Sequence, residues 1–132
     1  MNKKVGVVTG SSKGIGKAIA ITFAKSGEYL AVVTNARKLQ EAQTVSDEIR
    51  TLGCNSIPIE ADISKEEDCI RLIEETIKNY NRIDVLVNNA GVQQDIPLEE
   101  TTVDLWQKIL AVDLTAAFRC CREAINHMEK QQ

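Results

Sequence analysis

The sequence predicts an α/β fold in which a parallel sheet is covered by helices on both faces. Short apolar runs, β-branched in part and bounded by Gly, Asn or charged residues, alternate with amphipathic stretches of helical spacing. The order is β-α-β-α-β-α-β, which requires right-handed crossovers between parallel strands. A doubly wound sheet contains two such halves, and this sequence supplies the N-terminal half followed by one long helix.

The four expected strands are the apolar runs at residues 5–9, 29–34, 56–60 and 83–88. Stripes of apolar residues at helical spacing predict the first two helices. These stripes are Ile15, Ile19 and Phe23 in the first helix and Leu39, Ala42, Val45, Ile49 and Leu52 in the second. Gly53 is expected just after the second helix, where glycine readily adopts the left-handed conformation.

The third helix is predicted to begin at Ser64, because a serine N-cap with Glu67 three residues later forms a capping box. After the fourth strand we expect a loop at residues 88–98 and a long helix that Thr101 or Thr102 opens and that runs to about Met128. The apolar residues of these two helices are Cys69, Leu72, Ile73 and Ile77, and then Trp106, Ile109, Leu110, Leu114, Ala117, Phe118, Cys121, Ile125 and Met128.

Length and composition exclude several functions. A chain of 132 residues with 43% hydrophobic and 27% charged residues is typical of one soluble globular domain, here residues 1–132. Its net charge of −3 and scattered Lys and Arg residues argue against nucleic-acid binding. The apolar runs are far shorter than the roughly 20 residues that cross a bilayer. We therefore expect no membrane partner and, without a secretory signal, a cytoplasmic protein.

The cysteines and the single histidine do not indicate a metal site. Cys54, Cys69, Cys120 and Cys121 form no C-x-x-C pair, and no histidine accompanies them at zinc-binding spacing. We expect all four thiols to be reduced. His127 falls near a helix C-terminus, where a cation is favourable, and is interpreted as a surface residue.

The strongest chemical signal is the glycine-rich segment T-G-S-S-K-G-I-G-K at residues 9–17, between the first strand and the first helix. Glycines there let the backbone approach a ligand, and the helix N-terminus presents N–H groups to a pyrophosphate. The segment is not a P-loop, because Ser11 replaces its first glycine and Ala18 its magnesium-binding hydroxyl. A glycine-rich turn without a ligand is the alternative reading of the glycines alone.

The spacing of Gly10, Gly14 and Gly16 resembles the T-G-x-x-x-G-x-G loop of the short-chain dehydrogenase/reductase family. A-D-I-S at residues 61–64 and N-N-A-G at residues 88–91 resemble two further motifs of that family, and the resemblance extends over residues 1–121. Taken singly, residues 61–64 also fit the start of a capped helix, and residues 88–91 also fit an ordinary turn. The resemblance implies a Rossmann-like fold with a dinucleotide held by Gly10, Ser12, Lys13, Gly14, Ile15, Gly16, Arg37, Asp62, Ile63, Asn89, Ala90 and Gly91.

The choice of dinucleotide depends on the charges that follow the second strand. A carboxylate there binds the ribose hydroxyls of NAD, whereas a cation accommodates the 2′-phosphate of NADP. The segment T-N-A-R-K at residues 34–38 supplies Arg37, and the next acid is Glu41. With Lys13 in the glycine loop, this favours NADP(H) over NAD(H). Alternatively, Arg37 and Lys38 are solvated charges at a helix start.

The resemblance implies hydride transfer between the nicotinamide and a small carbonyl or alcohol substrate, with a Tyr-x-x-x-Lys pair, a serine and an asparagine at the catalytic site. Tyr29 and Tyr80 are followed four positions later by Val33 and Asp84, so neither forms this pair. We therefore expect a chain that is truncated before the catalytic half and inactive alone. Asp113 stands at the position of the asparagine and lacks an amide donor; a partly buried structural carboxylate is the alternative.

Two functional hypotheses remain. The first is an NADP(H)-dependent oxidoreductase of which this chain is the cofactor-binding half. The second is a non-catalytic nucleotide-binding or oligomerisation module, because the fourth strand would be a sheet edge and the long helix would expose apolar residues. In the family this helix contributes to a subunit interface, so the resemblance implies a homo-oligomer formed through the long C-terminal helix. The substrate is not readable from the sequence.

Overall fold

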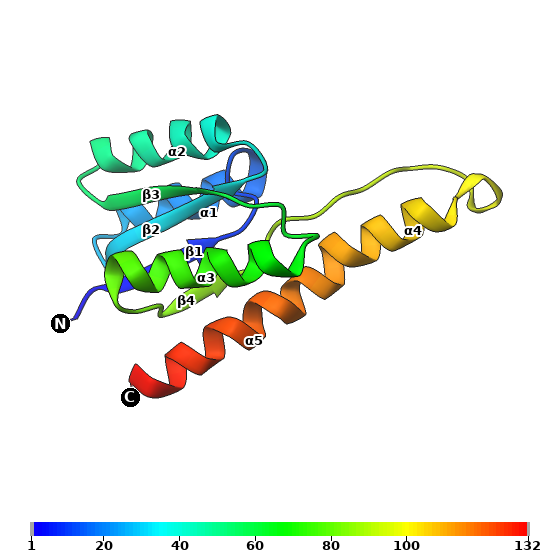
Figure 1. Ribbon diagram of the computed structural model, residues 1–132. Helices are drawn as coiled ribbons and strands as arrows, with labels where there is room; N and C mark the ends of the chain where they lie inside the picture. Colours follow the sequence, from blue (N-terminus) through cyan, green and yellow to red (C-terminus); the bar gives the residue numbers. More distant parts are fainter. Residues whose placement is uncertain (1, 132) are drawn as a thin grey trace.

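A computed structural model describes residues 2–131 and contains a four-stranded parallel sheet (Figure 1). The strands are β1 (Lys4–Val8), β2 (Tyr29–Ala36), β3 (Asn55–Glu60) and β4 (Val85–Val87), in the order β3-β2-β1-β4. They alternate with the helices α1 (Gly14–Lys25), α2 (Leu39–Thr51) and α3 (Glu66–Tyr80). The predicted α/β class, with half of a doubly wound Rossmann-like sheet, is confirmed.

Each face of the sheet buries its own hydrophobic core. Val7 and Val33 belong to a core on the side of α3 and of the later helix α5 (Ala116–Met128), whereas Val8 and Val32 belong to a core on the side of α1 and α2. Neighbouring residues separate in this way because successive side chains of a strand point to opposite faces. Figure 1 shows the two helical layers on either side of the sheet.

The strand ends differ from the prediction. β2 continues to Ala36 because it lies between two strands, and Ala36 is still paired with Glu60 of β3. β4 is shorter than residues 83–88 because it is an edge strand that pairs only with residues 6–8 of β1. Ile83 lies before β4, and the Gln131 side chain bonds both its N–H (2.8 Å) and its carbonyl (3.0 Å).

The apolar stripe predicted for the first helix is correct for Ile19 and Phe23, which are partly buried against the core, and wrong for Ile15. Ile15 is 75% exposed, and the buried residues of α1 are instead Gly16, Ala20 and Ala24. These small residues let the helix backbone approach the sheet closely, a packing that hydrophobic size alone does not reveal. Phe23 is half-buried, and its ring stacks on that of Tyr29.

The second helix follows the prediction at its centre. Ala42, Val45 and Ile49 are buried, while Leu39 and Leu52 at the two ends are exposed. Gly53 follows the helix with φ +82°, in the left-handed region as expected.

The predicted capping box of the third helix is wrong. The N-cap residue of α3 is Lys65, and no side chain caps the helix. The Ser64 hydroxyl instead donates to Asp62 Oδ1 at 2.7 Å. Ser64 therefore belongs to the turn before the helix, two residues before α3 begins at Glu66.

The predicted long helix is present and consists of three parts: α4 (Val103–Leu110), a π-helical turn (Ala111–Thr115) and α5. It opens as expected at Thr102, whose hydroxyl accepts a hydrogen bond from the Leu105 N–H at 3.2 Å. α5 packs beside α3, whereas α4 and the loop after β4 project beyond the sheet (Figure 1).

One side of this helix is buried and the other is not. Ala116, Cys120 and Ala124 face the core. The residues that we call the outer face are exposed by between 37% and 65%: Trp106, Leu110, Leu114, Phe118 and Ile125. This agrees with the expectation that the helix displays apolar side chains.

The described part of the chain holds no helix long and apolar enough to cross a membrane. Nor do residues 2–131 bring three or more His, Cys, Asp or Glu side chains into an arrangement that holds a metal ion. All four cysteines are free thiols, of which only Cys121 is exposed. His127 lies in the last turn of α5.

Candidate functional site

A cleft of about 650 Å³ lies where the segments that follow all four strands meet. Its volume is in the range of small-molecule sites, and the carboxyl ends of the strands are where ligands bind in open α/β sheets. The lining residues come from four segments of the chain and from the long helix: Gly10, Ser12, Lys13, Gly14, Ile15, Asn35, Ala36, Arg37, Glu41, Ala61, Asp62, Ile63, Ser64, Asn89, Ala90, Gly91, Val92, Lys108 and Val112.

Every cofactor residue that the sequence predicted lines this cleft except Gly16, which lies behind the loop. A Cβ atom at Gly16 would collide with the Asn89 amide and the Gly10 carbonyl. Gly10 has φ +58°, and a Cβ there would approach Ala90 to 2.8 Å. Both glycines are therefore required for the loop to pack against the end of β4.

The glycine loop presents a row of free backbone donors. The Gly10 and Ser11 N–H groups are bonded to Asn35, to its Oδ1 at 3.1 Å and its carbonyl oxygen at 3.0 Å. Within residues 2–131, by contrast, the N–H groups of residues 12–15 have no hydrogen-bond partner. They stand at the N-terminus of α1, where free N–H groups and the helix dipole together favour an anion.

Asn35 is a site residue that the sequence analysis missed. It is only 2% exposed, and its Nδ2 donates to the carbonyls of Ile59 (3.1 Å) and Ala61 (3.3 Å). Its own N–H donates to Ser11 Oγ at 2.9 Å. The available signal was a polar residue directly after the predicted second strand, since buried amides need partners. Asn35 joins the glycine loop to the ends of β2 and β3.

Asn89 connects the ends of β1 and β4 in the same way, through its side-chain amide. Its Nδ2 donates to the carbonyls of Thr9 and Gly10, both at 3.0 Å. The Thr9 hydroxyl in turn accepts from the N–H groups of Asn89 and Ala90 at 3.0 Å each. The glycine loop is thus held from both sides, by Asn35 on one and Asn89 on the other.

Asp62 is the most strongly held carboxylate of the cleft. Its Oδ1 accepts from the hydroxyl (2.7 Å) and the N–H (3.1 Å) of Ser64. The hydroxyl bond is the main cause that lowers the pKa of Asp62, and the charges of Lys65 and Arg37 act in the same direction against a partial desolvation. Asp62 is therefore ionised at neutral pH.

Charged side chains of both signs surround the rest of the cleft. The predicted cations Lys13 and Arg37 line it, whereas Lys38 does not. Two further charges that the sequence analysis did not assign to the site also line it: Glu41 from α2 and Lys108 from α4. Glu41 and Lys108 reach the cleft because of the way α2 and α4 pack beside it. The spacing of charges along the sequence does not reveal this packing.

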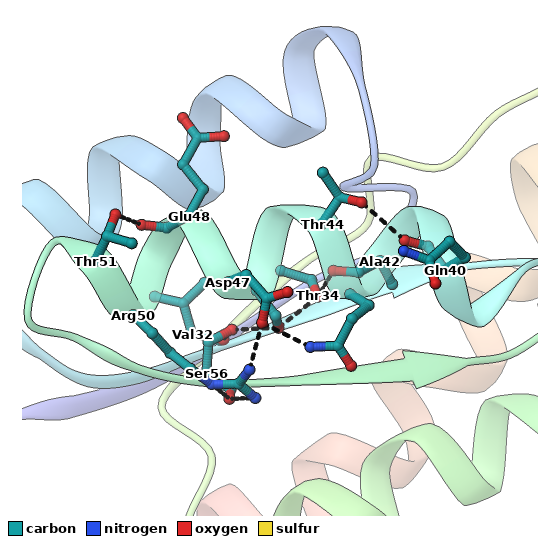
Figure 2. Close-up of polar contacts among 12 residues, drawn as sticks. Val32, Thr34, Gln40, Ala42, Thr44, Asp47, Glu48, Arg50, Thr51 and Ser56 are labelled. Carbon is teal, nitrogen blue, oxygen red and sulfur yellow. Dashed lines mark hydrogen bonds and ion pairs between the residues drawn. The ribbon is translucent and has the colours of Figure 1, made fainter.

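A buried chain of hydroxyl groups fixes α2 beside the cleft (Figure 2). Thr34 Oγ1 donates to the Ala42 carbonyl at 2.9 Å and lies 3.0 Å from Ser46 Oγ. Ser46 Oγ is in turn 2.6 Å from Ser56 Oγ, which donates to the Val32 carbonyl at 2.6 Å. These contacts join α2 to the second half of β2 and to the start of β3.

Asp113 does not line the cleft but lies next to its edge. It is in the π-helical turn, and its Oδ1 accepts from the Val92 N–H at 2.7 Å. The carboxylate is exposed rather than partly buried, but it does lie next to a backbone donor, as the alternative interpretation requires. It holds the segment that follows β4 against the long helix.

Solved structures share this fold. L-sorbose reductase from Gluconobacter frateurii, complexed with NADPH and L-sorbose, is 30% identical with a TM-score of 0.92, over 99% of this chain and 49% of that one. A metagenomic short-chain oxidoreductase in complex with NADP is 33% identical with a TM-score of 0.88, over 95% and 56%. An alcohol dehydrogenase from the archaeon Thermococcus sibiricus, complexed with 5-hydroxy-NADP, is 28% identical with a TM-score of 0.91, over 98% and 55%.

The chain therefore spans about half the length of these structural relatives. The profile of a protein family described as short chain dehydrogenase matches residues 4–132, which is nearly the whole chain. The cleft, the glycine loop and this match agree, and the chain belongs to the short chain dehydrogenase family.

Proposed function

We propose that the chain binds NADP(H) in the cleft and is the cofactor-binding half of an oxidoreductase that acts on a small carbonyl or alcohol substrate. The observation that carries the proposal is the row of free N–H groups at residues 12–15, beside the cations Lys13 and Arg37. Three structural relatives are complexed with NADPH, NADP or 5-hydroxy-NADP, which supports the same cofactor class here.

The chemistry of the donor groups fits the parts of this cofactor. The N–H groups of residues 12–15 are suited to the pyrophosphate, and Lys13 and Arg37 to a 2′-phosphate. The Asp62 carboxylate is an acceptor for the adenine amine. Asn89, Ala90 and Gly91 border the cleft after β4, where we place the nicotinamide side. When bound, the cofactor supplies or accepts a hydride.

The cofactor proposal is tested by titrating NADPH and NADH while following nicotinamide fluorescence. We expect tighter binding of NADPH, and tighter binding of NADH would contradict the roles of Lys13 and Arg37. Arg37→Ala should weaken NADPH binding by about tenfold, the effect of removing a charge-assisted contact. Lys38→Ala is the matched control, because Lys38 follows directly in the sequence but does not line the cleft; it should leave NADPH binding nearly unchanged.

We further propose that these 132 residues bind the cofactor without turnover. Neither tyrosine in the chain has a lysine four positions later. Asp113 then has a positioning role for the segment after β4, through Val92. Robust oxidation of NADPH by the purified chain with any aldehyde or ketone would contradict this part of the proposal.

The second candidate function is a non-catalytic nucleotide-binding or oligomerisation module. The observation that favours it is the outer face, whose apolar side chains remain exposed on the described chain. In either case we propose a homo-oligomer formed through the long C-terminal helix, in the cytoplasm. A monomeric mass by light scattering at micromolar concentration would contradict the oligomer.

A further inference from the structure

Glu41 is a charged group of the cleft that the proposed function does not use. It lies in the first turn of α2 and lines the same cleft as Arg37. We propose that Glu41 is a specificity-determining residue that opposes Arg37, so that the cleft accepts NAD(H) as well and prefers NADP(H) by less than about tenfold. This inference rests on the proposed binding of a dinucleotide and concerns only how its two forms are distinguished.

The Glu41 carboxylate has no other role in the described structure. Within residues 2–131 its side chain makes no hydrogen bond and no ion pair. The other acids of α2 are engaged: Asp47 contacts Arg50 at 2.8 Å, and Glu48 contacts Lys17 at 2.8 Å. The second carboxylate of the cleft, Asp62, accepts two hydrogen bonds from Ser64 at Oδ1, and the proposed function assigns it to the adenine amine. Glu41 is therefore the acid lining the cleft that has neither a partner in the described structure nor a role in the proposed function.

The backbone at Glu41 is fixed, so the charge cannot leave the cleft by a movement of the helix. The Glu41 N–H donates to the Lys38 carbonyl at 3.2 Å. The carbonyl of the next residue, Ala42, accepts the buried Thr34 hydroxyl at 2.9 Å, and that hydroxyl belongs to the chain that joins α2 to β2 and β3 (Figure 2).

The two forms of the cofactor differ in the charge that they bring to this part of the cleft. A carboxylate accepts hydrogen bonds from ribose hydroxyls, which NAD presents. The 2′-phosphate of NADP carries up to two negative charges, which a carboxylate repels and a guanidinium attracts. The charge of Arg37 also contributes slightly to the lowered pKa of Asp62, so a second carboxylate of the cleft lies within reach of that charge. Opposing charges in one cleft therefore lead to weak discrimination between NADP(H) and NAD(H).

The test compares the affinities of NADPH and NADH in the wild type and in Glu41→Gln, which keeps the size of the side chain. We expect Glu41→Gln to bind NADPH about threefold to fivefold more tightly and NADH more weakly, the scale of an exposed charge interaction. At 1 M salt the gain for NADPH should largely disappear, because the Debye length falls to about 3 Å. A change in packing would not show this dependence on salt.

Glu28→Gln is the matched control. It removes the same charge just before β2, at the opposite end of that strand from the cleft, where Glu28 contacts Lys4. It should leave the ratio of the two affinities unchanged. If the wild type binds NADPH and Glu41→Gln has the same ratio, or a gain that persists at 1 M salt, the inference is overturned while the proposed function stands. If neither dinucleotide binds the wild type, the proposed function fails and the inference with it.

Discussion

The glycine loop and the long helix differ in how completely their side chains find partners within this chain. Around the glycine loop, Asn35 and Asn89 bond the ends of the strands together, and no buried side-chain nitrogen or oxygen among residues 2–131 lacks a partner. The long helix buries Cys120 but leaves the outer face exposed. The difference teaches that the geometry of the cleft depends on contacts within the chain, whereas contacts within the described chain leave the outer face uncovered.

The largest effect is expected from Asn35→Ala, which would remove the hydrogen bonds between the glycine loop and the ends of the strands. The change leaves the Gly10 N–H and the Ile59 and Ala61 carbonyls without their partner. We expect a loss of about 2–4 kcal/mol in the free energy of unfolding, measured in urea, because unpaired buried polar groups are costly. Asn55→Ala, at an exposed position of β3, is the control and should cost under about 0.5 kcal/mol. Equal losses in both variants would refute the role of Asn35.

Gly16→Ala tests the close packing behind the same loop. The added methyl group would meet the Asn89 amide and the Gly10 carbonyl, and neither can move without loss of the bonds that hold the loop. We expect a destabilisation of about 1–3 kcal/mol, as for overpacking of a core, together with weaker binding of NADPH. Unchanged urea unfolding and NADPH affinity would show that the loop can shift to accommodate the methyl group, contrary to this prediction.

Asp62→Asn is expected to have a smaller and pH-dependent effect. The pKa of Asp62 is lowered in the folded state, so its stabilising contribution is present above the unfolded-state pKa of about 4 and is lost as the pH falls through the folded-state pKa. Because the group is partly exposed, we expect a loss below about 1 kcal/mol at pH 7. Urea unfolding at pH 7 and pH 3 should show a smaller difference between the variant and wild type at pH 3. A constant difference would contradict the ionic origin.

The smallest effect on stability is expected on the outer face. Leu114 and Phe118 are 65% and 61% exposed, so Leu114→Ser with Phe118→Ser should change the free energy of unfolding by under about 1 kcal/mol. Self-association, measured by light scattering, should nevertheless weaken clearly. Leu39→Ser is the control, because Leu39 is an exposed leucine of α2 outside this face. If it reduces association equally, the outer face is not the interface.

The sequence predicted the fold well because each strand and helix carried a local signal. The alternation of segments located all four strands, and Thr102 marked the start of the long helix. The errors arose where tertiary contacts decided the outcome. Ile15 was assigned to the apolar stripe because of its helical spacing from Ile19, yet the residues of α1 that are buried against the sheet are Gly16, Ala20 and Ala24. β2 extended to Ala36 because strands flank it on both sides.

The candidate site was predicted where motifs carry it and missed where distant segments meet. The glycines and the residues 61–64 and 88–91 lie in recognisable motifs that follow strands. Asn35 acts through carbonyls about 25 residues away in the chain, and Glu41 and Lys108 reach the cleft only because two helices pack beside it. Such contacts have no periodic signature in one sequence.

The π-helical turn at Ala111–Thr115 has a consequence for the phase of the long helix. In an α-helix, residues four apart drift forward around the axis by about 40°, because each residue advances about 100°. A π turn is wider and advances less per residue, so it cancels part of that drift. Trp106 and Leu110 precede the turn, while Leu114 and Phe118 lie within and after it. The wide turn thereby reduces the drift of their four-residue repeat around the helix axis, and all four side chains are exposed.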